Sequence, residues 1–358
     1  MRMNVRLFRA FPDPFRKSME IYADQLLRGI RPLLQNHETI DDCLPSDVRL
    51  KGSARYWDQY VRYQWLSRSF QGDVNHIIDH GYGHLVYTLP AHKTVVTFHD
   101  STVNTLSGMA YSTRLSVQYS FTAMRKAARI ITDSHVSRRD FLSLVNYPEN
   151  HVEVVYPGID PAFQPLQDRE ELKRRLSLPG TYILHVGHTL PYMNVEKVLM
   201  AIECLVKRHG IDAHLVKVGD AFTRGQEALL DRLDLKGRVI HLGKIPLKDL
   251  IAIYNCADAL LYPVLYAGFG LPPLEAMACG IPVVCSDRGA LPEIVGDAAI
   301  MTDPEDHQQI AAHVAVLLAD SSVREAYRAK GLRQAQKYSW DNTARQVVAI
   351  YRRVYESA

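Results

Sequence analysis

The residues with the clearest chemical meaning lie at 261–284, which read as a strand, a glycine loop, a helix and a second strand. Gly268 and Gly270 permit backbone conformations, and a close approach by a ligand, that other residues obstruct. Two prolines then suit the first turn of a helix, whose amides and dipole attract phosphate. Glu275 follows about one turn later, where its carboxylate could accept two hydrogen bonds from a ribose diol. The alternative is an ordinary turn with a carboxylate that favours the helix dipole.

His99 is the second candidate, because it follows the apolar run 94–98. A strand there would place His99 at the carboxyl end of a sheet, where open α/β sheets bind their ligands. The alternative is a packed histidine beside Asp100, which would then cap a helix. Further histidines occur at 76–92, but no third ligand has a spacing that favours a metal site.

The elements that must position these residues alternate along both halves of the chain. The first half has predicted strands at 4–8, 76–78, 94–98, 130–132 and 152–156, and predicted helices at 19–33, 113–128 and 137–145. The second half has predicted strands at 182–186, 214–218, 239–242, 259–262, 283–285 and 298–301, and a closing amphipathic helix at 340–354. Such alternation predicts an α/β fold with parallel sheets covered on both faces.

Local signals mark where helices begin and where the two series part. Thr223 with Gln226, and Ser322 with Glu325, have the spacing of capping boxes, which start helices. Residues 156–161 are rich in proline and glycine, and they follow the last strand of the first series. A domain boundary is therefore expected there.

Length and composition exclude several classes of protein. The chain has 358 residues and a formal net charge of +3, which predicts two domains and argues against a nucleic-acid partner. No apolar run is long enough to span a bilayer, and the first residues read as a strand rather than a signal peptide. The five cysteines are scattered and form no Cys-x-x-Cys pair, which fits buried thiols in a reducing cytosol. We therefore expect a soluble, cytoplasmic protein.

The string from Gly268 to Val284 resembles the signature of family 4 glycosyltransferases, which have the GT-B fold. Further motifs resemble that family in order and spacing, at 95–100, 131–134, 155–160, 185–187, 218–220 and 285–298. The resemblance implies two Rossmann-like, doubly wound domains that face a central cleft. It implies an acceptor-binding domain at 1–165, a nucleotide-sugar-binding domain at 166–340 and a helix at 341–358 that packs back on the first domain.

The resemblance also implies a reaction. A hexose would move from a nucleotide-diphosphate sugar, of the GDP-mannose or UDP-sugar type, to a glycan or lipid-linked saccharide. The anomeric configuration would be retained, and no metal or other cofactor would be needed; the sequence has no Asp-x-Asp, the spacing that holds a metal ion in other glycosyltransferases. Catalysis would fall to His99 and Glu275. Donor binding would fall to Gly187, His188, Asn194, Lys244, Ile245, Gly268, Phe269, Gly270, Leu271 and Glu275.

The sequence departs from the family pattern at three places. Ala267 stands where the family has the first of two glutamates, and one charged hydrogen bond is worth about 1.5–3 kcal/mol. Met193 stands where a lysine usually reaches the diphosphate, so Asn194 is expected to cap the next helix and leave its first amides available. The first loop, 11–18, lacks both the usual Gly-Gly pair and the Gly-x-Gly-x-x-Gly of nicotinamide dehydrogenases. Its candidate phosphate residues are Arg16, Lys17 and Ser18, with Ser18 as an N-cap and a solvated basic turn as the alternative.

Several interpretations stay open. Ala267 and Met193 also fit a GT-B protein that binds sugar nucleotides with weak or lost activity, and a nucleotide-sugar epimerase would share the fold. The basic residues between 125 and 139 predict a solvated surface, with a weak peripheral contact at the inner membrane face as the alternative. Aromatic and imidazole groups stack on sugars, so an acceptor-pocket wall is predicted at His76, His80, Tyr82, His84, Tyr87 and His92.

Overall fold

The computed structural model describes residues 3–11, 17–43, 57–101 and 111–358. The chain divides into two compact units. Unit 1 comprises Met1–Gly158 and Tyr338–Ala358, and unit 2 comprises Ile159–Lys337. Within the described ranges, no helix combines the length and the apolar character that crossing a bilayer requires.

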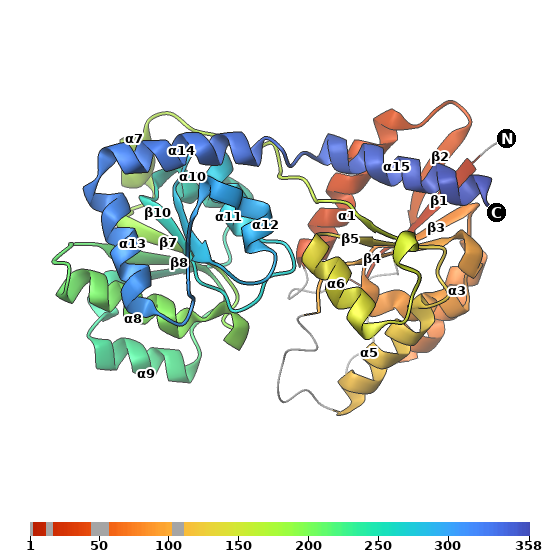
Figure 1. Ribbon diagram of the computed structural model, residues 1–358, viewed down its shortest axis with the longest axis horizontal. Coiled ribbons are helices and arrows are strands. Elements are labelled where there is room, and N and C mark those ends of the chain that lie inside the picture. Colours follow the sequence, from red (N-terminus) through yellow and green to blue (C-terminus); the bar gives the residue numbers. More distant parts are fainter. Residues whose placement is uncertain (1–2, 12–16, 44–56, 102–110) are drawn as a thin grey trace. The chain divides into compact units, whose positions relative to one another are not determined.

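Over its described residues, unit 1 is built on a parallel sheet in the order β2-β1-β3-β4-β5-β6 (Figure 1). The strands are β1 (Met3–Phe8), β2 (Glu38–Cys43), β3 (Val74–Ile77), β4 (Thr94–Phe98), β5 (Arg129–Thr132) and β6 (Val152–Val154). The main helices are α1 (Lys17–Ile30), the π-helix η2 (Asp58–Arg62), α3 (Tyr63–Ser69), the 3-10 helix η3 (His80–Tyr87), α5 (Tyr111–Met124), α6 (His135–Leu144) and α15 (Trp340–Glu356). The order reverses between β1 and β3, which defines a topological switch point.

The last helix completes the core of unit 1. The apolar face of α15 packs with α1 and β1 in one buried cluster, and α15 runs alongside α1 in Figure 1. Ser339 caps the helix by accepting a hydrogen bond from the amide of Asn342. The Tyr351 hydroxyl lies 2.6 Å from His76 Nδ1, so a polar contact also ties the helix to β3.

The first passage between the units, at 158/159, lies inside the proline- and glycine-rich residues 156–161, where the local sequence predicts a boundary. The bounds that the resemblance implies, 165/166 and 340/341, fall a few residues beyond the limits of the compact units at 158/159 and 337/338. A Cβ at Gly158 would lie 2.1 Å from the amide nitrogen of Trp340, so the two backbones touch. The Thr343 hydroxyl donates to the Tyr156 carbonyl at 2.7 Å. These contacts keep both segments in unit 1.

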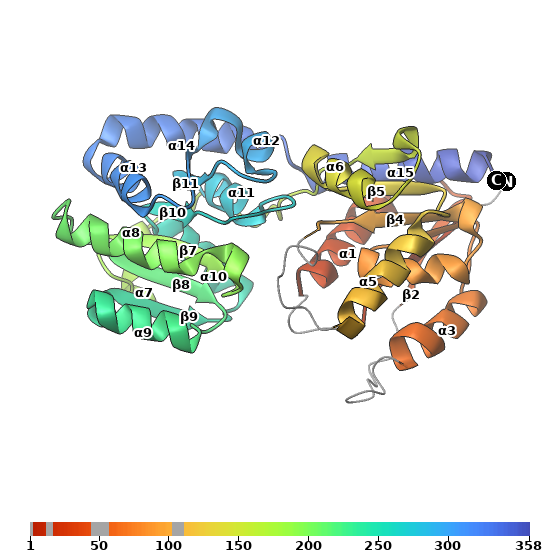
Figure 2. The same ribbon diagram turned by 60° about the horizontal axis from the view of Figure 1, so that its bottom comes forward.

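Unit 2 has a parallel sheet in the order β12-β11-β10-β7-β8-β9, with helices on both faces (Figure 2). The strands are β7 (Tyr182–Gly187), β8 (His214–Gly219), β9 (Val239–Gly243), β10 (Ala259–Tyr262), β11 (Val283–Ser286) and β12 (Ile300–Thr302). The helices include α7 (Arg169–Arg175), the 3-10 helix η6 (Pro191–Met193), α8 (Val195–Lys207), α9 (Arg224–Leu233), α10 (Leu247–Cys256), α11 (Leu271–Ala278), α12 (Leu291–Val295), α13 (His307–Ala319) and α14 (Ser321–Ala335). Here the order reverses between β7 and β10.

The predicted α/β fold is confirmed, and each predicted strand is present with its ends shifted by a few residues. The edge strand β2 was missed. The capping box of Thr223 and Gln226 is confirmed. The one predicted for Ser322 is wrong, because Asp320 lies before the helix and accepts hydrogen bonds from the amides of Ser322 and Val323. A carboxylate two residues earlier takes the capping position.

Candidate functional site

The predicted donor-binding residues gather at the switch point of unit 2. β7 ends at Gly187, and β10 leads into the loop 263–270 before α11. The amide of Leu265 donates to the carbonyl of Tyr192 at 2.7 Å, which joins the loops that follow these strands. Ligands of open α/β sheets bind at the carboxyl ends of strands where the order reverses. The topology therefore favours ligand binding where the two loops meet.

Glycines bring the ends of β7 and β8 together. Gly187 has φ +148°, and a Cβ there would lie 2.3 Å from Met193 Cε. Gly219 has φ +118°, and a Cβ there would lie 2.2 Å from the carbonyl oxygen of Gly187. Met193 is only 3% exposed, so its side chain fills the space beside Gly187. The position where the family has a lysine is therefore part of the packing under the loop.

The glycine loop leads into α11, whose first turn has few backbone amides that could bind a ligand. Gly270 has φ +120°, and a Cβ there would lie 2.6 Å from Leu291 Cδ2. α11 begins at Leu271, and the two prolines that follow carry no N–H. Of the first three helical residues, only Leu271 therefore offers an amide to a phosphate. Gly268 and Phe269 are buried beside it, so this side of the site is mostly backbone.

Glu275 lies in the second turn of α11 and is half-buried. Its Oε2 accepts a hydrogen bond of 2.7 Å from the Tyr254 hydroxyl of α10, while Oε1 has no hydrogen-bond partner among the described residues. Burial raises the pKa of Glu275 to about 7, with the hydroxyl of Tyr254 acting in the opposite direction and the charge of Asp160 adding to the rise. One carboxylate oxygen is thus fixed and the other remains available for a ligand's hydroxyl group.

A histidine and a lysine follow β7 and β9, and both contact the carboxylate of Asp220, which follows β8. His188 Nδ1 lies 2.8 Å from Asp220 Oδ2, and Lys244 Nζ lies 3.4 Å from Asp220 Oδ1. Burial acts to raise the pKa of Asp220, but the hydrogen bonds and charges of His188 and Lys244 outweigh it and hold the pKa below its usual value. Asp220 therefore positions two basic side chains at the edge where a diphosphate would need them.

A buried lysine binds the backbone at the carboxyl ends of β7 and β8. Lys217 lies in β8 with no exposed surface, and its Nζ donates to the carbonyls of Gly187 and Asp220. Burial lowers the pKa of Lys217 to about 8, against the opposing charge of Asp220. Neither Lys217 nor Asp220 was predicted as a site residue. The sequence signal for Lys217 was a lysine inside an otherwise apolar strand.

Asn194 stands at the N-cap position of α8, as predicted, but its side chain makes no capping hydrogen bond. It has φ +56°, and its side-chain amide donates to the carbonyls of Pro263 and Pro304 at 2.9 and 2.7 Å. These distant partners hold the side chain more firmly than the local helix start does. Asn194 therefore braces the loops of β10 and β12 and is buried. Ile245 is half-buried in the loop after β9, next to Lys244.

Ala267 sits tightly against a second loop. A Cβ at Gly289, which has φ +62°, would lie 2.7 Å from the carbonyl oxygen of Ala267. That oxygen also accepts a hydrogen bond of 2.9 Å from the amide of Ala290. The backbone at 267 is therefore fixed, although the alanine brings no carboxylate to the site.

His99 lies at the carboxyl end of β4, as predicted, but its ring faces the interior of unit 1. Nδ1 is 2.7 Å from Asp133 Oδ2, and Nε2 is 2.8 Å from the carbonyl oxygen of Ile78. Both neighbours are hydrogen-bond acceptors, so both ring nitrogens donate and the ring is an imidazolium. Burial acts to lower the pKa of His99, but Asp133 outweighs it and raises the pKa to about 9. In this arrangement His99 contributes charge and holds no nitrogen free to accept a proton.

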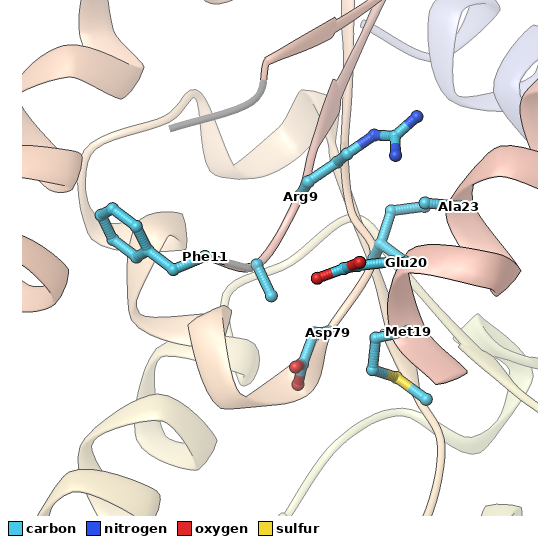
Figure 3. Close-up of a pocket in the computed structure, with 8 residues that line it drawn as sticks. Arg9, Phe11, Met19, Glu20, Ala23 and Asp79 are labelled. Carbon is cyan, nitrogen blue, oxygen red and sulfur yellow. The ribbon is translucent and has the colours of Figure 1, made fainter. Parts of the chain in front are cut away.

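A small pocket marks the switch point of unit 1. It has a volume of about 10 Å³, the space of one water molecule, and Arg9, Glu20 and Asp79 supply its ionisable lining (Figure 3). Arg9 forms ion pairs with Asp24 and Asp42, and Figure 3 shows its guanidinium turned away from Asp79. Carboxylates therefore dominate the polar lining. Such a lining repels phosphate and can accept a hydrogen bond from one hydroxyl group, since the pocket has room for one such group and not for a whole sugar ring.

Several predicted residues of unit 1 do not form a binding wall. His76, Tyr82 and His84 are buried. They are core residues because distant partners such as Tyr351 hold them, which the local sequence does not show. The predicted N-cap Ser18 is wrong, since α1 already begins at Lys17. Arg16 lies outside the described residues, as does the side chain of Lys17.

Solved structures share this architecture. Sucrose-phosphate synthase from Thermosynechococcus elongatus matches with a TM-score of 0.81 and 18% identity over the whole of both chains. Anabaena Alr3699/HepE in complex with UDP and glucose matches with a TM-score of 0.77 and 17% identity, over 98% of this chain and 99% of that one. These likenesses show the fold, which is the GT-B fold of glycosyltransferases.

Sequence comparison then gives the family. The model of Glycosyl transferases group 1 matches residues 168–334, and that of Glycosyltransferase Family 4 matches residues 30–163. The O-antigen chain mannosyltransferase B of Escherichia coli is 35% identical over 273 residues, which are 73% of this chain and 70% of that protein. The chain belongs to the group 1, family 4 glycosyltransferases.

Proposed function

We propose that this glycosyltransferase moves a hexose from a nucleotide-diphosphate sugar to a glycan or lipid-linked saccharide, with retention of the anomeric configuration. Unit 2 holds the nucleotide sugar and unit 1 holds the acceptor. The contrast between the two switch points carries this proposal. That of unit 2 presents His188 and Lys244 beside glycine loops, which suits a diphosphate, whereas that of unit 1 presents Glu20 and Asp79, which suits a sugar hydroxyl group.

The proposed roles follow the local chemistry. His188, Lys244 and the amides of the glycine loop stabilise the negative charge of the leaving diphosphate, so no metal ion is required. Glu275 accepts hydrogen bonds from the ribose diol through the oxygen that Tyr254 does not hold. His99 acts through its positive charge. GDP-mannose is the first donor to test, because the relative from Escherichia coli is named a mannosyltransferase, and a UDP-sugar is the second.

Transfer assays with a panel of donors test the proposal. Each of GDP-mannose, UDP-glucose and their free nucleotides is incubated with a short lipid-linked saccharide, and nucleotide release and product are measured. We expect acceptor-dependent release with one donor, unchanged by EDTA, and NMR should show the donor's anomeric configuration in the product. Loss of turnover with EDTA, restored by magnesium or manganese, would show that the metal-free mechanism is wrong.

Ala267 supports a second reading, a sugar-nucleotide-binding protein with weak or lost transfer. The Ala267→Glu variant separates the two, because a carboxylate that meets charge at the reacting centre acts mainly in the transition state. If the chain is impaired, the variant should raise kcat about tenfold or more with little change in KM. If the wild type is fast and the variant slower, Ala267 is an adaptation to one sugar. Free sugar-nucleotide product formed without acceptor would instead reveal an epimerase.

A peripheral contact with the inner face of a membrane would suit a lipid-linked acceptor, and one surface supports it. Trp57, which precedes η2, Val61 of η2 and Trp65 of α3 are spaced by four residues, and the two tryptophans are 60% and 68% exposed. Gln64 bonds the hydroxyl of Tyr119 on α5, which is itself exposed, so the surface continues there. Tryptophan and tyrosine favour the membrane interface.

Vesicle sedimentation tests this surface. We expect wild type to sediment with vesicles rich in anionic lipid, and Trp57→Ser/Trp65→Ser to remain in solution. Leu190→Ser, which changes an exposed apolar residue of unit 2, is the matched control. Equal sedimentation of all three proteins would remove the membrane proposal without touching the transferase one.

A further inference from the structure

A cavity of unit 2 lies at the edge of the sheet opposite the switch point. It has a volume of about 260 Å³, and Asp258 and Pro282, which immediately precede β10 and β11, contribute to its lining. Because all strands of the sheet are parallel, these residues mark the amino ends of the strands. The cavity is therefore separate from the loops proposed to hold the nucleotide sugar.

Three arginines line this cavity and only two carboxylates accompany them. Arg169 begins α7, and Arg324 and Arg328 lie one turn apart on α14, while the carboxylates are those of Asp258 and Glu325. Arg169 pairs with Asp258 at 2.6 Å, and Arg328 reaches Glu325 only at 3.3 Å. Arg324 bonds two backbone carbonyls at the end of α13 and, among the described residues, no carboxylate. The cavity thus has a formal excess of one positive charge.

The guanidinium groups keep donors in reserve. Arg169 uses one terminal nitrogen, Nη2, to bond the carboxylate of Asp258 and the carbonyls of the two residues that precede Asp258. The Nε of Arg169 is buried with no hydrogen-bond partner among the described residues. Arg324 and Arg328 likewise use only Nη1 in their hydrogen bonds. A guanidinium has five N–H donors in a planar fork that matches the oxygens of phosphate.

A glycine makes room for one of these groups. Gly280 has φ +75°, and a Cβ there would lie 3.1 Å from Arg328 Nε. The turn between α11 and β11 therefore leaves the guanidinium of Arg328 beside the cavity. The walls come from α7, which follows the first passage of the chain into unit 2, and from α14, which precedes the passage out.

We infer that this cavity binds a small phosphate-bearing anion, inorganic phosphate or a phosphorylated monosaccharide, independently of the nucleotide sugar. The volume is below the 300–1,000 Å³ or so of sites for larger ligands, which excludes a whole nucleotide sugar. The anion bridges Arg169 on α7 and the arginines of α14. It thereby ties together the segments through which the chain enters and leaves unit 2.

Calorimetry on the full chain tests this inference. The protein is first saturated with GDP or UDP, whichever binds, and is then titrated with inorganic phosphate, pyrophosphate and glucose 6-phosphate. We expect one further site for at least one probe. Arg324→Gln/Arg328→Gln should weaken that site about tenfold or more, because each substitution removes charge-assisted hydrogen bonds, and should leave nucleotide affinity unchanged. Arg333→Gln, an exposed change on the same helix outside the cavity, should bind like wild type.

The design separates this inference from the proposed function. Glu275→Gln should bind nucleotide about tenfold to a hundredfold more weakly and still bind the anion, and thermal melting confirms that each variant is folded. If no probe binds to the wild type, or if the double variant binds as tightly as the wild type, the inference is wrong. If no nucleotide binds at all, the proposed function fails, while titration of the free chain and of the double variant still decides the anion site.

Discussion

His99 is held as an imidazolium between Asp133 and the carbonyl of Ile78. Because its pKa is raised, we expect the stability of unit 1 to depend on pH. The folded-state pKa of about 9 exceeds the ordinary value of 6.5. The pair therefore stabilises the fold fully below pH 6.5 and loses this effect as pH rises through 9, by about 2–3 kcal/mol. His99→Gln/Asp133→Asn, which is neutral, should not show this loss.

Tryptophan fluorescence provides the measurement. All three tryptophans, Trp57, Trp65 and Trp340, belong to unit 1, so their signal in urea titrations reports that unit alone. Titrations at pH 6, 7.5 and 9 should show a steeper fall in the free energy of unfolding for wild type than for the double variant. Parallel curves would mean that His99 is neutral in the folded protein.

Glu275 gives a pH dependence of the same sign as His99, but here the charged form is the destabilised one. Its pKa of about 7 lies above the ordinary value of 4.5, so the folded state binds the proton more tightly. Stability is therefore lost as pH rises from 4.5 to 7, and the half-buried carboxylate costs about 1–3 kcal/mol above that range. Glu275→Gln should melt at a higher temperature than wild type at pH 8 and at the same temperature at pH 4.5.

The same variant should lose function. Removing the charged acceptor from the ribose should weaken nucleotide binding about tenfold to a hundredfold, measured by calorimetry at pH 8. Tyr254→Phe is the control, because it removes the fixed hydrogen bond and leaves the carboxylate. A Glu275→Gln protein that is neither stabilised nor impaired would contradict both the burial and the proposed role.

At the level of strands and loops, the sequence predicted those elements that a run of apolar residues marks. Strands such as β4 and β10 are apolar runs, so their positions followed from composition. β2 was missed because it is an edge strand of sequence ETIDDC, where exposed aspartates hide the pattern. The N-cap position of Asn194 was predicted, but the role of its side chain was not, because its partners Pro263 and Pro304 lie 69 and 110 residues away. Glu275 and His188 were predicted from family motifs and stay predictions as site residues, whereas the positioning contacts of Asp220 and Lys217 needed the fold.

The glycines at the ends of β7 and β8 are expected to contribute to the stability of unit 2. Gly187→Ala and Gly219→Ala should each destabilise unit 2 by about 1–3 kcal/mol, because both need positive φ and both meet close neighbours. Met193→Ala should restore part of the loss in Gly187→Ala, since the clash there is with the end of a flexible side chain. It should not help Gly219→Ala, whose clash is with the backbone of Gly187. Far-UV circular dichroism in urea measures all four proteins, and equal rescue of both variants would show that Met193 does not fill this space.

The chain passes twice between its units, so one unit is a single continuous segment and the other is made of two segments. Unit 2 is one continuous segment, 159–337, whereas unit 1 needs both 1–158 and the last helix. Ala344, Val347, Val348 and Tyr351 of α15 are buried in the same cluster as β1 and α1. A fragment that lacks α15 would therefore expose this apolar face and leave His76 without its tyrosine partner.

Fragments test this asymmetry. A protein of residues 159–337 should fold alone, melt cooperatively and be stabilised by the nucleotide that stabilises the full chain, because it contains its own sheet and the proposed nucleotide site. A protein of residues 1–158 should aggregate or lack a cooperative transition, and adding a peptide of residues 338–358 should restore one. Circular dichroism and melting with GDP or UDP provide the measurements. If 1–158 folds without the peptide, α15 is dispensable to the core; if 159–337 folds but no nucleotide raises its melting temperature while the full chain responds, the nucleotide site depends on residues of unit 1.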